Sequence, residues 1–270
     1  MNTCYRRILL VLAIVVALPA IGVGSPVANV LPGYDLFETT TGTNLNGIPL
    51  QGVPLGTYDF GGAIGVQSVG NTDTIVQRLQ TATAPSLPGT APTINLQMLA
   101  LQMETVTPVD LGAGLNNYFV TLQSIRGGPA TTGTMDITFA NSAGGTFNSF
   151  FDVFYDIRVG ALNGPIVNSS DLTLTGTANT WTRTPPPSAV TINGVNIDLN
   201  GVNSNSDFWP TPPVTESHPG GGAHVVNDAV PEPSTFVLAV LGFLSLLICA
   251  QQWGSDIHQL AQPASPSQKC

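Results

Sequence analysis

Alternation of apolar and polar residues is the main pattern in the middle of the chain. Phe151, Val153, Tyr155, Ile157 and Val159 occupy every second position, and charged or polar residues fill most of the positions between them. A period of two turns one set of side chains toward a core and the other toward water, which is typical of a β-strand. Shorter runs that favour strands lie at 57–60, 63–69, 117–125, 135–139 and 172–174.

The segment 94–103 changes phase halfway. Apolar residues alternate with polar ones from Ile94 to Met98, and from Leu99 to Met103 they take the other phase. A β-bulge or a strand buried on both faces explains the change, and a helix is the competing interpretation.

Turn-forming residues divide the chain at intervals of about ten to fifteen positions. They include the Gly61-Gly62 pair and Asn193-Gly194, which predicts a hairpin within 190–199. About eight short strands with such spacing predict an all-β protein, an antiparallel β-sandwich or jelly roll over 29–207. The segment 208–229 is rich in Pro and Gly, so we expect it to be a linker.

The amino end has the pattern of a secretory signal peptide. Arg6 and Arg7 precede eleven apolar residues at 8–18, and small residues follow. This order predicts export and a signal helix within 1–28, with cleavage after Ala20, Gly24 or Ala28.

Near the carboxyl end, residues 236–250 form a run of fifteen without a charge. A helix of that length spans roughly 22 Å, and uncharged flanking residues bring it close to the thickness of a bilayer. A buried core helix is the alternative, but no later domain follows that would cover it. We therefore expect a transmembrane helix within 230–252 and a polar tail over 253–270.

Pro231, Glu232 and Pro233 lie directly before this apolar run. Each proline fixes its backbone φ and keeps its neighbour extended, a shape that suits recognition in a processing cleft. The arrangement resembles the PEP-CTERM sorting tail of exported bacterial proteins. This resemblance covers roughly the last forty residues, and it implies recognition of the three residues by an exosortase-like processing enzyme after passage through the secretion machinery.

The tail departs from the PEP-CTERM pattern in one respect. That pattern places a cluster of Arg or Lys after the helix, whereas 251–260 contains neither and Lys269 is the single cation of the tail. The positive-inside stop signal is therefore nearly absent. The sequence leaves open whether the tail is cleaved or remains as a membrane anchor.

The charge of the chain excludes some partners. Between positions 29 and 230 there are fourteen acidic residues and four arginines, a net charge of about −10 from those counts. Nucleic acid and anionic lipid would both repel such a surface. We therefore expect any contact with a membrane to be made by the apolar tail. The three cysteines, Cys4, Cys249 and Cys270, all lie outside 29–229, so this span has no disulfide or thiol chemistry.

Candidate catalytic or metal-binding residues are few. His218 and His224 are weak metal ligands, because Pro219 and three glycines between them leave the pair unorganised. Asp152 and Asp156 lie about 13 Å apart along a strand, too far for a carboxylate pair, and we expect a solvated face there. Motifs for a nucleophile or a phosphate loop are missing from the chain, so we predict no enzyme and no cofactor.

Three functions fit the sequence. The first is an exported protein of the cell surface or extracellular matrix without catalytic activity. The second is a carbohydrate-binding β-sandwich that would contact extracellular polysaccharide through exposed rings of Trp181, Phe208 or Trp209. The third is an extracellular hydrolase, which would require two carboxylates that converge in a cleft.

Overall fold

The structure is a computed structural model that describes residues 28–112, 114–185 and 208–228. Several predictions fall outside these ranges: the signal peptide, the hairpin at 190–199, the sorting motif, the apolar run and the polar tail. Within the described ranges, no helix has the length and apolar character needed to cross a membrane.

Nearly all regular structure in these ranges is β-strand, with a single short 3-10 helix, η1 (Gln123–Arg126). The strands are β1 (Ala28–Val30), β2 (Gly33–Thr39), β3 (Asn44–Leu45), β4 (Ile48–Gly52), β5 (Gly56–Asp59), β6 (Val66–Gly70), β7 (Thr74–Arg78), β8 (Ala82–Ala84), β9 (Gly89–Thr90), β10 (Ile94–Thr105), β11 (Val109–Asp110), β12 (Leu115–Asn116), β13 (Tyr118–Leu122), β14 (Thr131–Asn141), β15 (Gly144–Val159), β16 (Ile166–Thr182), β17 (Trp209–Pro210), β18 (Val214–His218) and β19 (Gly222–Asp228).

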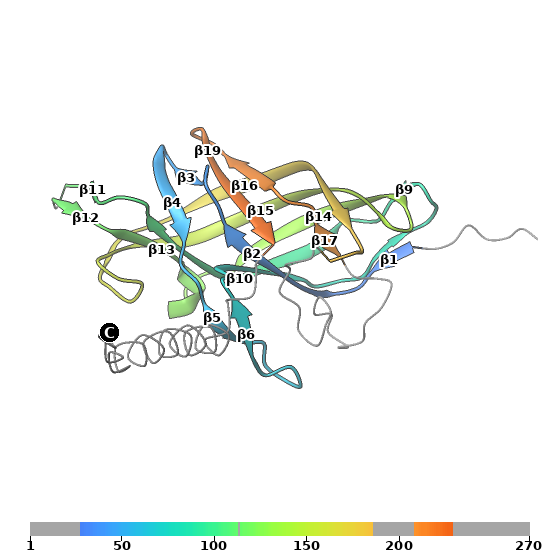
Figure 1. Cartoon of the computed structure of the whole chain (residues 1–270), viewed down its shortest axis with the longest axis horizontal. Helices are drawn as coiled ribbons and strands as arrows, with labels where there is room; N and C mark the ends of the chain where they lie inside the picture. Colours follow the sequence, from blue (N-terminus) through green and yellow to red (C-terminus); the bar gives the residue numbers. More distant parts are fainter. Residues whose placement is uncertain (1–27, 113, 186–207, 229–270) are drawn as a thin grey trace, which may run out of the picture.

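One large antiparallel sheet closes on itself (Figure 1). Its strands follow in the order β16, β18, β19, β2, β7, β10, β13 and β15, and β15 pairs with β16 again. β13 pairs with one half of β10 and of β15, and β14 pairs with the other half of each. The short helix η1 connects β13 to β14 in the chain. The antiparallel all-β prediction is confirmed. Instead of the two separate sheets of a sandwich, the pairing is continuous, because the β18–β19 hairpin bridges β16 and β2.

The prediction of a linker over 208–229 is wrong for the described part of that segment. Residues 208–228 form β17, β18 and β19, which pair with β16, β2 and one another. The turn of the hairpin uses Gly220 and Gly221, both at positive φ, where glycine has no steric penalty. This part of the chain therefore belongs to the domain, and the expected boundary at 207 does not hold.

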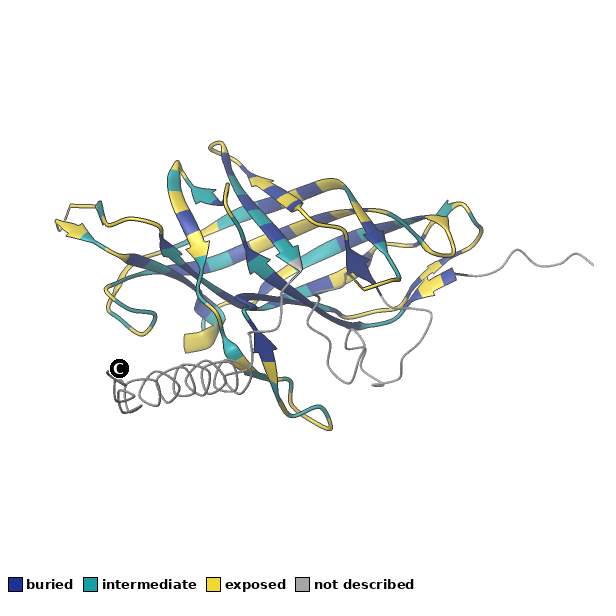
Figure 2. Cartoon of the chain, viewed as in Figure 1, coloured by how far each residue is buried: buried dark blue, intermediate teal, exposed yellow. Residues whose placement is uncertain are grey.

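The interior of the closed sheet holds the main core. Phe151, Val153 and Tyr155 of β15 all point inward and are buried, as their alternation predicts. Figure 2 shows buried and exposed positions alternating along the long strands. A fully buried side chain of this size contributes about 1.5–3 kcal/mol, so the inward row is a main source of stability.

A second, smaller core lies outside the sheet, where the β5–β6 hairpin covers β2, β7 and β10. Tyr34, Leu36 and Ile75 pack there against Tyr58 and Phe60 of the hairpin. The register of β10 against β7 shifts between Met98 and Ala100. Both explanations for the change of phase in 94–103 therefore apply: β10 has a bulge, and it is buried on both faces.

Candidate functional site

The interior contains a group of buried polar side chains, which we call the inner polar cluster. Its members are Thr39 on β2, Asp73 just before β7, Ser149 on β15, Glu216 on β18 and His224 on β19. Glu216 and His224 are opposite one another on neighbouring strands, and every member is at most 8% exposed. Strand alternation aims the four strand residues inward, and Asp73 enters from the loop before β7. All five lie among apolar neighbours, where a polar group needs a partner.

Half of the cluster is a chain of hydrogen bonds that ends on Asp73. The Thr39 hydroxyl and backbone N–H donate to the two Asp73 carboxylate oxygens at 2.7 and 2.6 Å, and the Thr74 hydroxyl adds a bond of 2.7 Å. Nε2 of His224 lies 3.1 Å from the Thr39 oxygen. While Asp73 is ionised, the single hydroxyl proton of Thr39 goes to its carboxylate, and Nε2 of His224 is then the donor to the Thr39 oxygen. His224 then holds its proton on Nε2 and leaves Nδ1 as an acceptor.

The other half is the bond from the Ser149 hydroxyl to Glu216 Oε1, at 2.7 Å. Two glycines make space for side chains of the cluster. A Cβ on Gly176 would press on the Ser149 oxygen and the Asn179 side chain, and a Cβ on Gly52 would overlap the Asp73 carboxylate. These positions therefore require glycine for close approach, although neither has a positive φ.

Burial drives the titratable members of the cluster toward their neutral forms. Loss of hydration raises the pKa of Glu216 to about 7, against the lowering effect of Ser149, and raises that of Asp73 to about 6 despite its three hydrogen bonds. The same cause lowers the pKa of His224 to about 4. A folded protein near pH 5 thus holds three uncharged groups at this site.

The variant Glu216→Gln is expected to remove a pH-dependent loss of stability. The folded pKa of Glu216 lies above its unfolded value, so stability falls as pH rises from about 4.5 through 7. An amide keeps the acceptor for Ser149 and cannot ionise. Denaturant titrations should show similar free energies of unfolding at pH 5, and at pH 8 an advantage for the variant of up to about 3 kcal/mol.

Glu104→Gln is the matched control, because Glu104 lies at the surface of β10 and accepts a hydrogen bond from Gln51. Equal pH profiles for Glu216→Gln and the parent protein would contradict the prediction. His224 has the opposite dependence: its lowered pKa weakens the fold as pH falls from 6.5 to about 4. His224 is the same in Glu216→Gln and in the parent protein, so the difference between their pH profiles isolates the contribution of Glu216.

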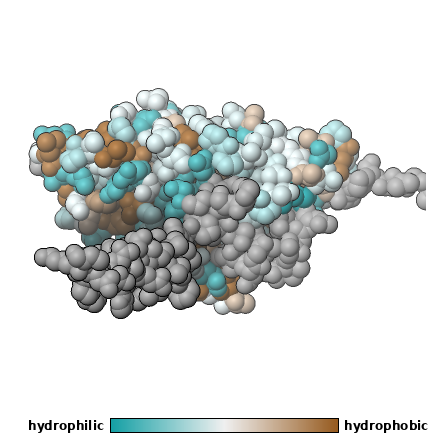
Figure 3. Space-filling model, viewed as in Figure 1, coloured by the Kyte–Doolittle hydropathy of each residue, from teal (hydrophilic) through white to brown (hydrophobic). Residues whose placement is uncertain are grey.

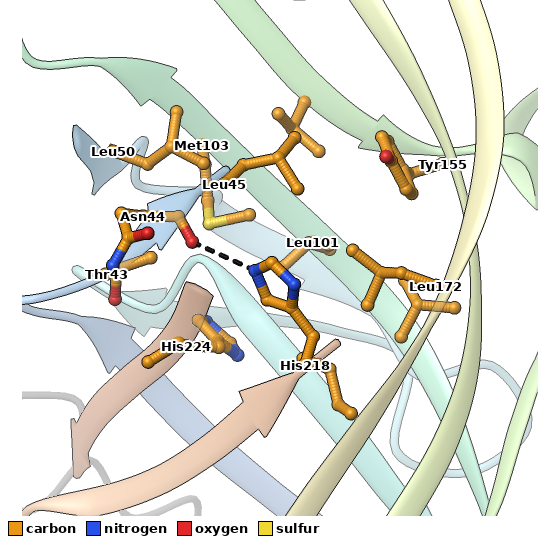
Figure 4. A pocket seen from close by; sticks show the side chains of 14 residues that line it. Thr43, Asn44, Leu45, Leu50, Leu101, Met103, Tyr155, Leu172, His218 and His224 are labelled. Atoms are coloured by element: carbon orange, nitrogen blue, oxygen red, sulfur yellow. Dashed lines mark hydrogen bonds between the residues drawn. The ribbon is translucent and has the colours of Figure 1, made fainter. Parts of the chain in front are cut away.

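The structure brings His218 and His224 to the same interior pocket, on β18 and β19 (Figure 4). The expectation that they lie unorganised in a linker is wrong, because the hairpin fixes both. Nδ1 and Nε2 of His218 face the carbonyl oxygens of Pro219 and Asn44 at 2.9 and 3.2 Å. The ring also lies where a Cβ on Gly222 would be, so that position needs glycine.

This geometry does not assemble a metal site from the two histidines. Both ring nitrogens of His218 are directed at carbonyl oxygens, and a ligand nitrogen must present a free lone pair. The described residues contain no group of three or more His, Cys, Asp or Glu side chains arranged to hold a metal ion.

The two cavities beside the inner polar cluster are small. One cavity of about 40 Å³ lies beside His218 and His224, and a second of about 30 Å³ lies beside Glu216 and His224. One water molecule needs roughly 10–15 Å³ on this measure, so each cavity has room for only a few waters. Neither can hold a sugar ring, and the inner polar cluster is therefore not a site for a polysaccharide in this conformation.

The aromatic residues proposed as sugar platforms are buried. Trp181, Phe208 and Trp209 are 2%, 0% and 4% exposed. The rings of Trp181 and Phe208 stack at 5.1 Å, and Phe139 meets Trp181 edge to face. The prediction of exposed rings is wrong because the pairing of β17 with the end of β16 closes this region: Trp181 of β16 and Phe208, just before β17, join the core, and Trp209 of β17 is also buried. The carbohydrate-binding alternative loses the observation on which it depended.

Asp152 and Asp156 behave differently from one another. Asp152 is exposed, as predicted, but Asp156 is fully buried under η1, contrary to the expected solvated face. Arg126 makes two bonds to it, at 2.6 and 2.9 Å, and Ser169 donates another of 2.6 Å. The Arg126 hydrogen bond, aided by Ser169 and Arg158, holds the pKa of Asp156 below its usual range. A permanently ionised, fully bonded carboxylate is a structural group and a poor catalyst.

The sequence pattern missed Thr39, Asp73, Ser149 and Glu216 as interior residues. Each has a polar side chain at a position where alternation alone would permit either face. The one available signal was a strand glycine beside each carboxylate, because Gly176 pairs with Glu216 and Gly52 lies against Asp73, and a glycine in a strand often marks a close approach. Comparison of the chain with protein-family models, with curated proteins and with solved structures found no match.

Proposed function

We propose that this chain is an exported protein of the cell surface or extracellular matrix, with a structural role rather than an enzymatic one. The observation that carries the proposal is the triplet Pro231, Glu232 and Pro233, followed at once by the apolar run 236–250. β19 ends at Asp228, so the triplet begins three residues after the last strand of the closed sheet. The motif therefore joins the folded domain almost directly to the segment proposed to enter the membrane.

Other features support this proposal. The apolar run at 8–18 supplies the export signal, and the domain is built without cysteine, so it does not depend on the redox state of its compartment. A signal helix before the sheet and a transmembrane helix after it would flank the domain. The proposed partners are the secretion machinery, an exosortase-like processing enzyme and the membrane that receives the carboxyl-terminal helix.

The test is intact-mass and terminal-peptide mass spectrometry on protein recovered from membrane, envelope and medium. We expect a mature amino end at residue 21, 25 or 29. A carboxyl end near Pro233 supports sorting and processing, and an intact end at Cys270 in the membrane supports an anchored form. Full-length protein in the cytoplasm with residues 1–28 still attached would contradict export.

Replacement of Pro231 and Pro233 by alanine is expected to block processing if the tail is cut. The reason is that alanine releases the φ restraint that keeps this segment extended. The matched control replaces Pro263 and Pro266, which lie beyond the apolar run. Loss of the shortened product in the first variant alone identifies the triplet as the recognised sequence. Equal processing of both variants would show that the triplet is not what the enzyme reads.

A further inference from the structure

Exposed apolar side chains gather at one end of the domain, which we call the apolar end. Among the described residues nine large hydrophobic side chains are exposed, and six of them belong to this end. Leu115 is the most exposed, at 75%. The six are Val106, Leu111, Leu115, Ile125, Ile166 and Val167.

The segments that carry these residues are neighbours in space. β11 and β12 pair as a hairpin, and Gly160 donates a backbone hydrogen bond to the Asn117 carbonyl, which ties the β15–β16 turn to the base of that hairpin. Ile125 of η1 and Leu162 of the turn line one outer hollow of about 230 Å³. Figure 1 places β11 and β12 at an extremity of the molecule, and Figure 3 shows hydrophobic atoms there. Clusters of this kind usually mark an interaction site.

The apolar end is also the part of the domain with the least net charge. It holds Arg126 and Arg158 against Asp110, Asp156 and Glu104, a net of −1. The other described residues include nine carboxylates and two arginines, but Asp35, Asp73, Glu216 and Arg78 are buried. Six carboxylates and Arg183 remain, a net of −5. Anionic headgroups would therefore repel this part of the domain more than the apolar end.

We propose that the apolar end is a lipid-facing surface that lies against the membrane holding the tail. This inference rests on the proposed function, because the tail brings the domain to the membrane. Across the sheet, Asp228 pairs with Phe37, Phe37 with Thr74, and Thr74 with Leu101 of β10. Asp228 therefore lies level with Leu101. Val106 lies five residues beyond Leu101, about 17 Å along the strand direction.

The connection to the tail is long enough for this orientation. The seven residues 229–235 span at most about 25 Å. β19 runs away from the apolar end, so these residues must turn back for the end to reach lipid. The opposite end of β10 is seven residues from Leu101, at Ile94, and the described residues there include no comparable group of exposed hydrophobic side chains. The shorter distance from Asp228 and the exposed hydrophobic residues thus both favour the apolar end as the end that contacts lipid.

A tryptophan reporter tests the proposal in the full chain. Leu115→Trp would be reconstituted in phosphatidylcholine vesicles with brominated acyl chains, which quench only rings within the lipid. The control is Leu79→Trp, at a position that is 41% exposed and lies next to Asn95 at the other end of β10. After subtraction of the parent emission, we expect a blue shift and quenching for Leu115→Trp and neither change for Leu79→Trp.

Flotation of the vesicles separates the possible failures. If the protein floats with the vesicles but neither added ring is quenched, the tail is an anchor and the lipid-facing proposal is overturned. A blue shift of Leu115→Trp without quenching would show that another protein copy covers the end, which also overturns it. If the protein does not float, the anchored form of the proposed function fails together with this inference.

Discussion

Replacement of Arg78 by methionine is expected to lower the free energy of unfolding by about 3–5 kcal/mol. Arg78 and Asp35 are each 2% exposed, and their side chains meet at 3.0 Å. The Arg78 guanidinium also donates to the Leu31 carbonyl and lies 5.2 Å from the centre of the Phe208 ring. Methionine fills much of the same volume without the cation, so the Asp35 carboxylate loses its ion pair inside the protein. Chemical denaturation at pH 7 measures the loss.

A double variant shows whether the buried charge is the cause. Replacing a whole buried ion pair by apolar groups is often close to neutral, whereas removing one partner is not. Asp35→Leu combined with Arg78→Met should therefore recover part of the stability that Arg78→Met loses. The deficit of the single variant should also shrink at acid pH, where a buried carboxyl takes up a proton. Equal losses in the single and double variants at every pH would show that lost packing, not the charge, is responsible.

The same buried pair shows what a sequence pattern can and cannot tell. Arg78 is one of four arginines in an acidic span, and nothing in its neighbourhood separates it from Arg126. Yet Arg78 is inside the sheet and Arg126 is 42% exposed. The difference is one of position in the fold: Arg78 lies on the inward face of β7, whereas Arg126 ends the short helix η1 at the surface. A polar residue gives no sign in the sequence of which of these places it will occupy.

The strands themselves were largely predictable, because their apolar residues carry the period. β15 follows the alternation of Phe151 to Tyr155, and the bulge in β10 follows the change of phase near Leu99. Glycines predicted the break between β5 and β6. In each case the local pattern and the tertiary environment agree, since the apolar set is the set that becomes buried.

Closure of the sheet was not predictable in the same way. β18 places Val214, Glu216 and His218 inward, and β19 places Gly222, His224 and Val226 inward. Four of these six positions are polar or glycine, so an apolar alternation could not reveal the strands. Their polar groups are tolerated inside because Ser149, Thr39 and two backbone carbonyls bond to them. The polar residues that form the inner polar cluster therefore also break the apolar alternation from which strands are predicted.

The combination of the inner polar cluster with small cavities bears on the proposed structural role. Buried polar groups with hydrogen-bond partners specify one arrangement of strands, since any slip in register would leave a donor or acceptor without a partner. A slip of one residue in β19 would turn His224 outward and Val225 inward. We infer that the cluster helps to fix the closing hairpin in place. This role requires no ligand, which agrees with an exported protein of structural function.

Deletion of residues 208–228 is expected to abolish cooperative folding of the domain. Without β17 to β19, β16 and β2 lose their connecting strands and the sheet stays open. The deletion also removes Phe208, Val214 and Val226 from the core, at most 4% exposed each. Their burial alone contributes about 5–9 kcal/mol, similar to the whole stability of a typical domain.

A chain that ends at Asp228 is the matched control, because it lacks the tail and keeps every described strand. It should retain a single sharp thermal transition by circular dichroism, whereas the deletion variant should aggregate or melt without one. The comparison separates two views of this segment. A linker could be removed with little effect on the rest of the domain, whereas strands that close the sheet could not. Equal transitions in the two proteins would contradict the closed sheet.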